Sequence, residues 1–198
     1  MTTANSSLQA LKEGNLRYRT GQARHPRQDA ARRQETLPQQ RPFAAILSCS
    51  DSRVPPEILF DQGIGDLFVI RTAGHVVDDA VLGSVEYAVD HLSVPLVVVL
   101  GHTRCGAVTA AVQSAQVQEK PHGSVGSLVE AILPAVQQTA GLSGDPVANA
   151  IDAHIRRTVE ALAAVPALAE RVRAGALHIL GACYDLESGE VVWLEGAD

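Results

Sequence analysis

Short apolar runs, separated by longer stretches with helical periodicity, constrain the fold of this 198-residue chain most strongly. The run 95–101 (PLVVVLG) is the clearest, because its β-branched valines favour a strand and no polar residues alternate with them. Such a run is typical of a strand buried on both faces, as in the centre of a parallel sheet. Further strands are predicted at 43–49, 67–73 and 176–184, and helices at 79–92, 105–115, 124–140, 147–164 and 166–174. This alternation predicts an α/β fold with a central, mostly parallel β-sheet flanked by helices.

The C-terminal part of the chain predicts a change of strand direction. A five-residue loop at 185–189 joins the strand 176–184 to an apolar segment at 190–194, which is typical of a hairpin. We therefore expect an antiparallel edge strand near the C-terminus. The sequence shows no internal repeat and no second boundary, so we expect a single α/β domain over residues 42–198.

Residues 1–41 form a distinct N-terminal arm. Residues 5–20 show helical periodicity, whereas residues 21–41 are rich in Arg and Gln and are expected to be weakly structured. The arm holds eight basic and three acidic side chains, a net charge of +5, so the remaining residues carry −11 of the total −6. Such an arm suits either a nucleic acid or the acidic body of a second subunit. Because aromatic interleaving for base stacking is absent, we expect a helical dimerisation arm that packs on a partner subunit, and no nucleic-acid partner.

The sequence predicts a cytoplasmic protein without a membrane partner. No apolar run approaches the roughly 20 residues of a membrane-spanning helix, and the first fifteen residues lack the apolar core of a secretion signal. The chain has three cysteines, and an odd, sparse set argues against a disulfide framework.

Two of the predicted strands end in residues that bind metals. Cys49 ends the strand 43–49, and His102 and Cys105 follow the strand 95–101. Functional residues of open α/β folds gather at the carboxyl ends of strands, where these three side chains can converge on one ion. Two thiolates and one imidazole favour zinc, and three protein ligands leave the open position of a catalytic site. The spacing alone leaves open that Cys49 and Cys105 are buried core thiols without a metal.

Asp51 and Arg53 lie on the loop that follows Cys49. A guanidinium can hold a carboxylate in a bidentate pair and keep it off the metal. The alternative is a loop salt bridge without a catalytic role. Because two thiolates neutralise Zn²⁺, we expect a site that works better above neutral pH. Asp51 is also a possible fourth zinc ligand in a closed state at low pH.

At this point the sequence resembles the β-class carbonic anhydrases. The stretches 49–74 (CSDSRVPPEILFDQGIGDLFVIRTAG) and 100–108 (LGHTRCGAV) match that family's paired motifs, and the resemblance continues through 82–92 to 181–191. It implies that the domain is catalytic and that Cys49, His102 and Cys105 hold one Zn²⁺ per subunit. The implied activity is that of a lyase, carbonate dehydratase: reversible hydration of carbon dioxide to bicarbonate and a proton by zinc-bound hydroxide, which Asp51 orients.

The resemblance also implies a substrate pocket shared across a dimer interface. Its expected lining residues, by their positions relative to the motifs, are Gln40, Phe68, Ala73, Tyr87 and Gly106. Because the Gln and the aromatic groups reach such a pocket across the interface, a monomer is expected to be inactive. The self-association expected is a dimer or a tetramer built from dimers.

Some residues depart from the family's pattern or lie outside its motifs. His75 stands where many members have Asn, as either a solvent-facing loop residue, which we favour, or a proton carrier at the pocket edge. Ile46 stands where members inhibited by bicarbonate have Trp, so the sequence does not favour that inhibitory pocket. Cys183 is expected to be a core thiol. The remaining histidines are interpreted as surface or structural: His25, His91, His122, His154 and His178.

Two alternative functions remain open. A carbonyl sulfide or carbon disulfide hydrolase shares the zinc chemistry and differs in pocket shape. A non-catalytic zinc module is disfavoured, because a structural zinc normally has four protein ligands.

Overall fold

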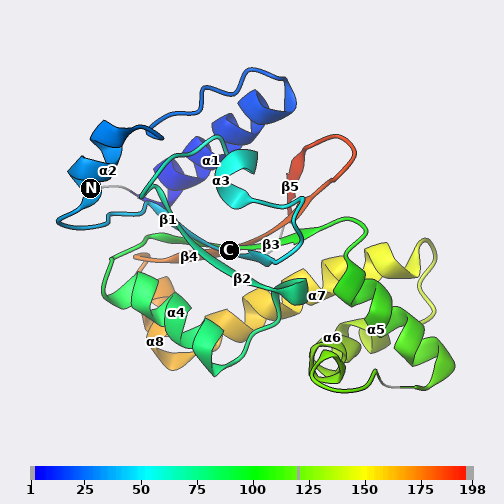
Figure 1. Cartoon of the computed structure of the whole chain (residues 1–198). Coiled ribbons are helices and arrows are strands. Elements are labelled where there is room, and N and C mark those ends of the chain that lie inside the picture. The colour runs from blue at the N-terminus through cyan, green and yellow to red at the C-terminus, as the bar shows by residue number, and fades with distance from the viewer. Residues whose placement is uncertain (1–2, 120, 195–198) are drawn as a thin grey trace.

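The computed structural model describes residues 3–119 and 121–194 and has a five-stranded β-sheet at its centre (Figure 1). The strands lie in the order β2-β1-β3-β4-β5. Their bounds are β1 (Ala44–Cys49), β2 (Leu67–Thr72), β3 (Leu96–His102), β4 (His178–Tyr184) and β5 (Val191–Trp193). The pairs β1–β2, β1–β3 and β3–β4 are parallel, and β5 runs antiparallel to β4. The predicted α/β fold, its parallel core and its antiparallel C-terminal edge are confirmed.

Helices cover both faces of this sheet (Figure 1). One face carries α1 (Ala4–Arg19) and α3 (Pro56–Leu59), whereas the other carries α4 (Asp79–Asp90), α7 (Pro146–Ala163) and α8 (Pro166–Arg173). Beside the sheet, two further helices pack on each other and on α7: α5 (Gly106–Val117) and α6 (Val125–Gln138). Apart from the short α3, these helices were predicted to within a few residues at each end.

The strand β3 shows why a continuous apolar run is required at the centre of the sheet. Successive side chains of a strand point to opposite faces. Val97 and Val99 accordingly pack on the side of α4 and α7, while Val98 and Leu100 pack on the side of α1. All of these side chains are fully buried.

The helix α2 (Ala30–Thr36) was not predicted, because residues 21–41 carry no apolar periodicity. None of its residues is buried, so burial does not explain the helix. Its N-terminus is instead capped by Asp29, whose carboxylate accepts a hydrogen bond of 2.8 Å from the backbone N–H of Arg32.

The helix α1 packs on the sheet of its own chain. Leu11 is fully buried in the apolar cluster that contains Ile46. Asn15 is also buried; its side-chain amide donates to the carbonyl of Leu59, and its side-chain carbonyl accepts from the N–H of Val191. This part of the arm therefore completes the core of its own subunit. Packing of the arm on a partner subunit stays a prediction.

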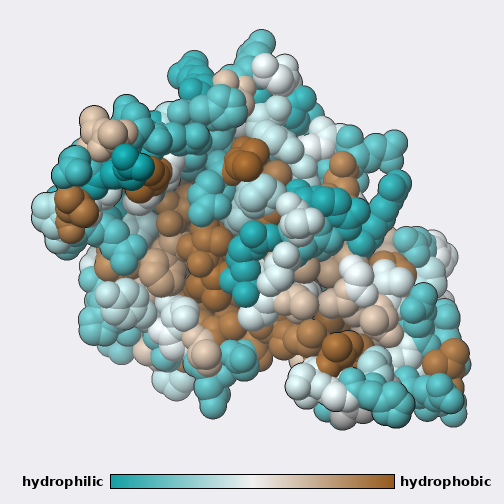
Figure 2. All heavy atoms as spheres, viewed as in Figure 1, coloured by the Kyte–Doolittle hydropathy of each residue, from teal (hydrophilic) through white to brown (hydrophobic). Residues whose placement is uncertain are grey.

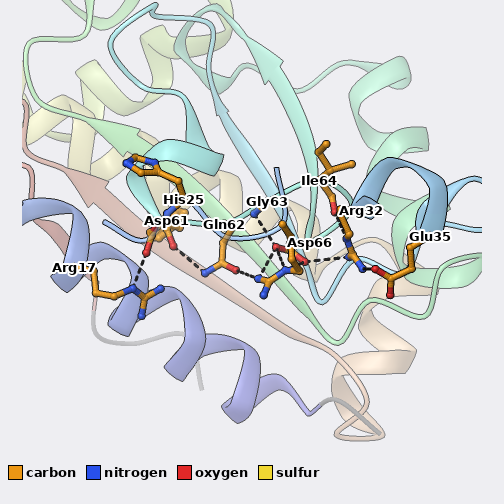
Figure 3. A network of polar contacts seen from close by, with 11 residues as sticks. Arg17, His25, Arg32, Glu35, Asp61, Gln62, Gly63, Ile64 and Asp66 are labelled. Atoms are coloured by element: carbon orange, nitrogen blue, oxygen red, sulfur yellow. Dashed lines mark hydrogen bonds and ion pairs between the residues drawn. The ribbon is translucent and has the colours of Figure 1, made fainter. Parts of the chain in front are cut away.

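An ion-pair network ties the basic arm to the acidic body of the same chain, as Figure 3 shows. Arg17 Nε lies 2.6 Å from Oδ2 of Asp61. Further along the arm, Arg27 Nη2 lies 2.6 Å from Oδ2 of Asp66, and Arg32 Nη2 lies 3.3 Å from its Oδ1. These pairs neutralise part of the charge asymmetry within one subunit.

Apolar side chains gather in a band across the middle of the face seen in Figure 2, where Figure 1 places β1 and β2. The strand β2 is the edge of the sheet, and its residues Leu67, Phe68 and Val69 are only half-buried. In the described part of the chain, no helix is long and apolar enough to cross a membrane.

Candidate metal centre

The predicted metal-binding residues meet at the carboxyl ends of two neighbouring strands. Cys49 is the last residue of β1, and His102 is the last residue of the adjacent parallel strand β3. The chain then turns through Arg104, which has a left-handed backbone (φ 57°), so that Cys105 comes to lie at the N-cap of α5. The parallel pairing of β1 and β3 thus brings together residues that are more than 50 positions apart in the sequence.

The ligand atoms of Cys49, His102 and Cys105 all lie within 4.8 Å of one another, and all three residues are buried. The Nδ1 atom of His102 lies 2.9 Å from the carbonyl oxygen of Thr103. Because a carbonyl only accepts, Nδ1 carries the proton and Nε2 has a free lone pair. Among the described residues, this buried Nε2 has no hydrogen-bond partner. A buried lone pair beside two cysteine sulfurs fits a soft or borderline metal ion such as zinc.

The thiols of Cys49 and Cys105 share a hydrogen bond, so the pKa of each depends on the other. A hydrogen bond from the thiol of Cys105 lowers the pKa of Cys49, and the same contact raises the pKa of Cys105. The sulfur of Cys49 also accepts backbone N–H groups, from Asp51 at 3.4 Å and from Gly74 at 3.2 Å. These donors favour the thiolate form of Cys49.

Asp51 and Arg53 form the predicted ion pair beside this group. Arg53 donates to both carboxylate oxygens of Asp51, and its backbone N–H donates to Oδ1 at 2.9 Å. These hydrogen bonds hold the pKa of Asp51 well below its usual range, so the side chain is a carboxylate. Its Oδ2 lies 3.9 Å from Nε2 of His102, on the side of the metal-binding nitrogen.

Arg71 of β2 contacts this loop and was not singled out from the sequence. Its Nε donates to the carbonyl of Cys49 at 3.0 Å, and its Nη2 donates to the carbonyl of Asp51 at 2.6 Å. The guanidinium thus braces the backbone of the Cys49–Asp51 turn. A signal was present, because Arg71 is a charged residue inside an apolar strand run.

The five predicted pocket residues lie on different elements. Phe68 of β2 and Tyr87 of α4 have ring centroids 6.1 Å apart, and Tyr87 is exposed. Gly106 begins α5 directly after the ligand Cys105, and Ala73 is half-buried next to Gly74. Gln40 is exposed. The assignment of these residues to one substrate pocket stays a prediction.

The structure corrects the interpretation of His75. It was expected to face solvent, but its side chain is buried, with 1% of its surface exposed. Burial lowers the pKa of His75 well below its usual value, which argues against a proton carrier. The ring stacks on that of His154, with centroids 4.5 Å apart.

Cys183 is less enclosed than predicted. It packs against the core but is half-buried and lines a cavity of about 420 Å³ beside α7. Burial raises the pKa of its thiol to about 12, so it is protonated at neutral pH. Cys183 lies outside the group formed by Cys49, His102 and Cys105.

Comparison with known proteins agrees with this geometry. The family model described as Carbonic anhydrase matches residues 44–191. Carbonic anhydrase 2 of Mycobacterium tuberculosis is 47% identical over 190 residues, covering 94% of this chain and 91% of the relative. Carbonic anhydrase of Mycolicibacterium smegmatis is 48% identical over 189 residues, covering 94% and 91%. Among solved structures, the β-carbonic anhydrase CcaA superposes with a TM-score of 0.75 at 29% identity, covering 98% of this chain and 91% of that one.

Proposed function

The chain belongs to the β-carbonic anhydrase family, and from that premise we propose that it hydrates carbon dioxide reversibly to bicarbonate and a proton. One zinc ion per subunit is held by Cys49, His102 and Cys105. The observation that carries the proposal is the convergence of these three ligand atoms, including the unpartnered Nε2 of His102 among the described residues. Two sulfurs and one imidazole nitrogen are a donor set that suits zinc.

A bound zinc ion supplies Lewis acidity, which lowers the pKa of a coordinated water and generates a nucleophile near neutral pH. The protein supplies orientation. The carboxylate of Asp51 stays ionised, so it can accept a hydrogen bond from a reacting group beside Nε2 of His102. Arg53 fixes the plane of this carboxylate through two hydrogen bonds.

The pocket for carbon dioxide is proposed to form between subunits, with Phe68, Tyr87 and Gln40 contributed across the interface and Ala73 and Gly106 beside the metal. Support comes from the half-buried apolar edge strand β2, which carries Phe68, and from the exposure of Tyr87 and Gln40. Two β-carbonic anhydrases of Sordaria macrospora with a similar fold are tetrameric, and we propose a dimer, or a tetramer of such dimers, for this chain. The proposed location is the cytoplasm, since all three cysteines are free thiols.

Stopped-flow measurement of carbon dioxide hydration with a pH indicator tests the activity, together with the zinc content of the same preparation. We expect one zinc per subunit and turnover that a chelator abolishes. Turnover of carbonyl sulfide and carbon disulfide on the same sample tests the alternative hydrolase. Faster turnover of either sulfur compound than of carbon dioxide would assign the site to that reaction.

A further inference from the structure

Gly74 makes buried hydrogen bonds through both its N–H and its carbonyl group. The N–H donates to the sulfur of Cys49 at 3.2 Å. The carbonyl oxygen lies 2.9 Å from Nε2 of His154, a residue of α7 that is 80 positions away. A carbonyl only accepts, so Nε2 of His154 carries the proton and donates it. A continuous path of hydrogen bonds therefore runs from α7 to a metal ligand.

The backbone conformation of Gly74 does not by itself fix this hydrogen-bonded path, which therefore depends on the groups packed around Gly74. Its backbone is left-handed, with φ 64° and ψ 21°, inside the short turn η1 (Ala73–His75). A Cβ atom at this position would lie 2.9 Å from Cδ1 of Ile132 and 3.0 Å from Cβ of Ala107. A larger residue would crowd these two side chains in addition to adopting a disfavoured backbone, so glycine suits this position. The conformational freedom of glycine means that other groups must fix the direction of its N–H.

His154 can fix the direction of the Gly74 N–H, because it holds the carbonyl of the same residue. Its side chain is buried, and burial lowers its pKa, so the imidazole is neutral at neutral pH. A neutral imidazole has one N–H, and here it is committed to Gly74. The ring is held from its side by stacking on His75, at a centroid distance of 4.5 Å and an interplanar angle of 29°.

We propose that His154 is a positioning residue of the metal centre, which acts through Gly74 to keep a backbone N–H directed at the sulfur of Cys49. It rests on the proposed function only in taking Cys49 as a metal ligand. An N–H donor withdraws electron density from a thiolate, so losing its alignment makes the sulfur a stronger electron donor. The metal then becomes a weaker Lewis acid. Such groups behind the ligands typically change metal affinity or activity about 10- to 100-fold.

The test replaces zinc by cobalt(II) and compares the wild type with H154F, which keeps an aromatic ring against His75 but has no donor. The thiolate-to-cobalt charge-transfer band is expected to move to longer wavelength in H154F. Zinc affinity, measured by competition with a chromophoric chelator, is expected to fall about tenfold, because loss of the contact that positions the Cys49 sulfur outweighs its stronger donation. The midpoint of the pH–activity profile should move to higher pH, whereas a merely structural defect lowers activity equally at every pH.

Three further variants complete the experiment. H154Q places an amide N–H near the position of Nε2 and should restore the band and the affinity, whereas H154N is one methylene shorter and should not. This pair decides the question if H154F does not fold. T158V removes a buried hydroxyl that donates to the carbonyl of His154 on the same helix, and should leave the band unchanged. An unchanged band in both H154F and H154N, or an equal shift in T158V, overturns the proposal. A wild type without carbon dioxide turnover overturns the proposed function instead, and leaves the band comparison valid.

Discussion

Arg53 holds Asp51 through two parallel hydrogen bonds, Nε to Oδ1 at 2.9 Å and Nη2 to Oδ2 at 2.7 Å. A bidentate pair fixes both the position and the plane of a carboxylate, which a single contact does not. Arg53 is exposed, while the side chain of Asp51 is mostly buried and directed toward His102. The pair thus spans the boundary between solvent and the metal centre.

Replacing Asp51 by Ala tests its proposed role in orientation. Since Asp51 lies outside the three-residue ligand group, D51A should retain its zinc. Loss of a positioned proton acceptor should lower kcat/KM for carbon dioxide roughly 100-fold. Stopped-flow rates and zinc analysis of one preparation give both values. Full activity in D51A would show that the carboxylate has no part in the reaction.

Two of the three cysteines should be metal ligands, and the third should have no part in the metal site. C105A removes a ligand and should leave the protein without stoichiometric zinc and without activity. C183A should keep both, because this thiol lies on β4, outside the ligand group, and its pKa of about 12 keeps it protonated. Its cost in unfolding free energy should be about 1 kcal/mol. Equal zinc loss in the two variants would contradict this division.

Burial of His75 should make the protein sensitive to acid. Its folded pKa lies well below 6.5, so below that pH the unfolded chain binds a proton that the folded chain excludes. Stability should therefore fall by up to about 1.4 kcal/mol per pH unit as the pH decreases from 6.5. H75N should remove the part of this dependence that His75 contributes, and it should fold because Asn accepts the left-handed backbone at φ 46°.

Urea unfolding of the wild type and H75N at pH 7 and pH 5 measures this difference. The loss of stability between the two pH values should be smaller in H75N. Part of the dependence should remain, because burial also lowers the pKa of His154. Parallel losses in the two proteins would mean that His75 is not the titrating group.

Asp61 should be the residue that secures the arm. Burial alone would raise its pKa, but hydrogen bonds from the side chain of Arg17 and the backbone N–H groups of Arg24 and His25 lower it overall. D61N preserves the shape but removes the charge, so it should cost about 2–3 kcal/mol of unfolding free energy. D152N is the matched control, because Asp152 forms an exposed ion pair with Arg156 and should cost less than about 1 kcal/mol. Similar costs in both would show that the network in Figure 3 contributes little.

Local sequence patterns predicted the strands, most of the helices and the three residues that the structure brings together as a candidate metal site. The continuous apolar run of β3 and the order of Cys49, His102 and Cys105 along the chain can be read locally. A parallel sheet then brings the ends of its strands together. The capped helix α2 was missed because it buries nothing.

The residues that surround this group follow from the tertiary structure and not from any local sequence pattern. The burial of His75, the hydrogen bond from His154 to Gly74 and the packing of α1 on its own sheet join residues far apart in the sequence. No local pattern distinguishes a histidine on a helix that faces solvent from one that donates to a buried carbonyl. That difference depends on which helix face the sheet covers, and it is set when the core packs as a whole.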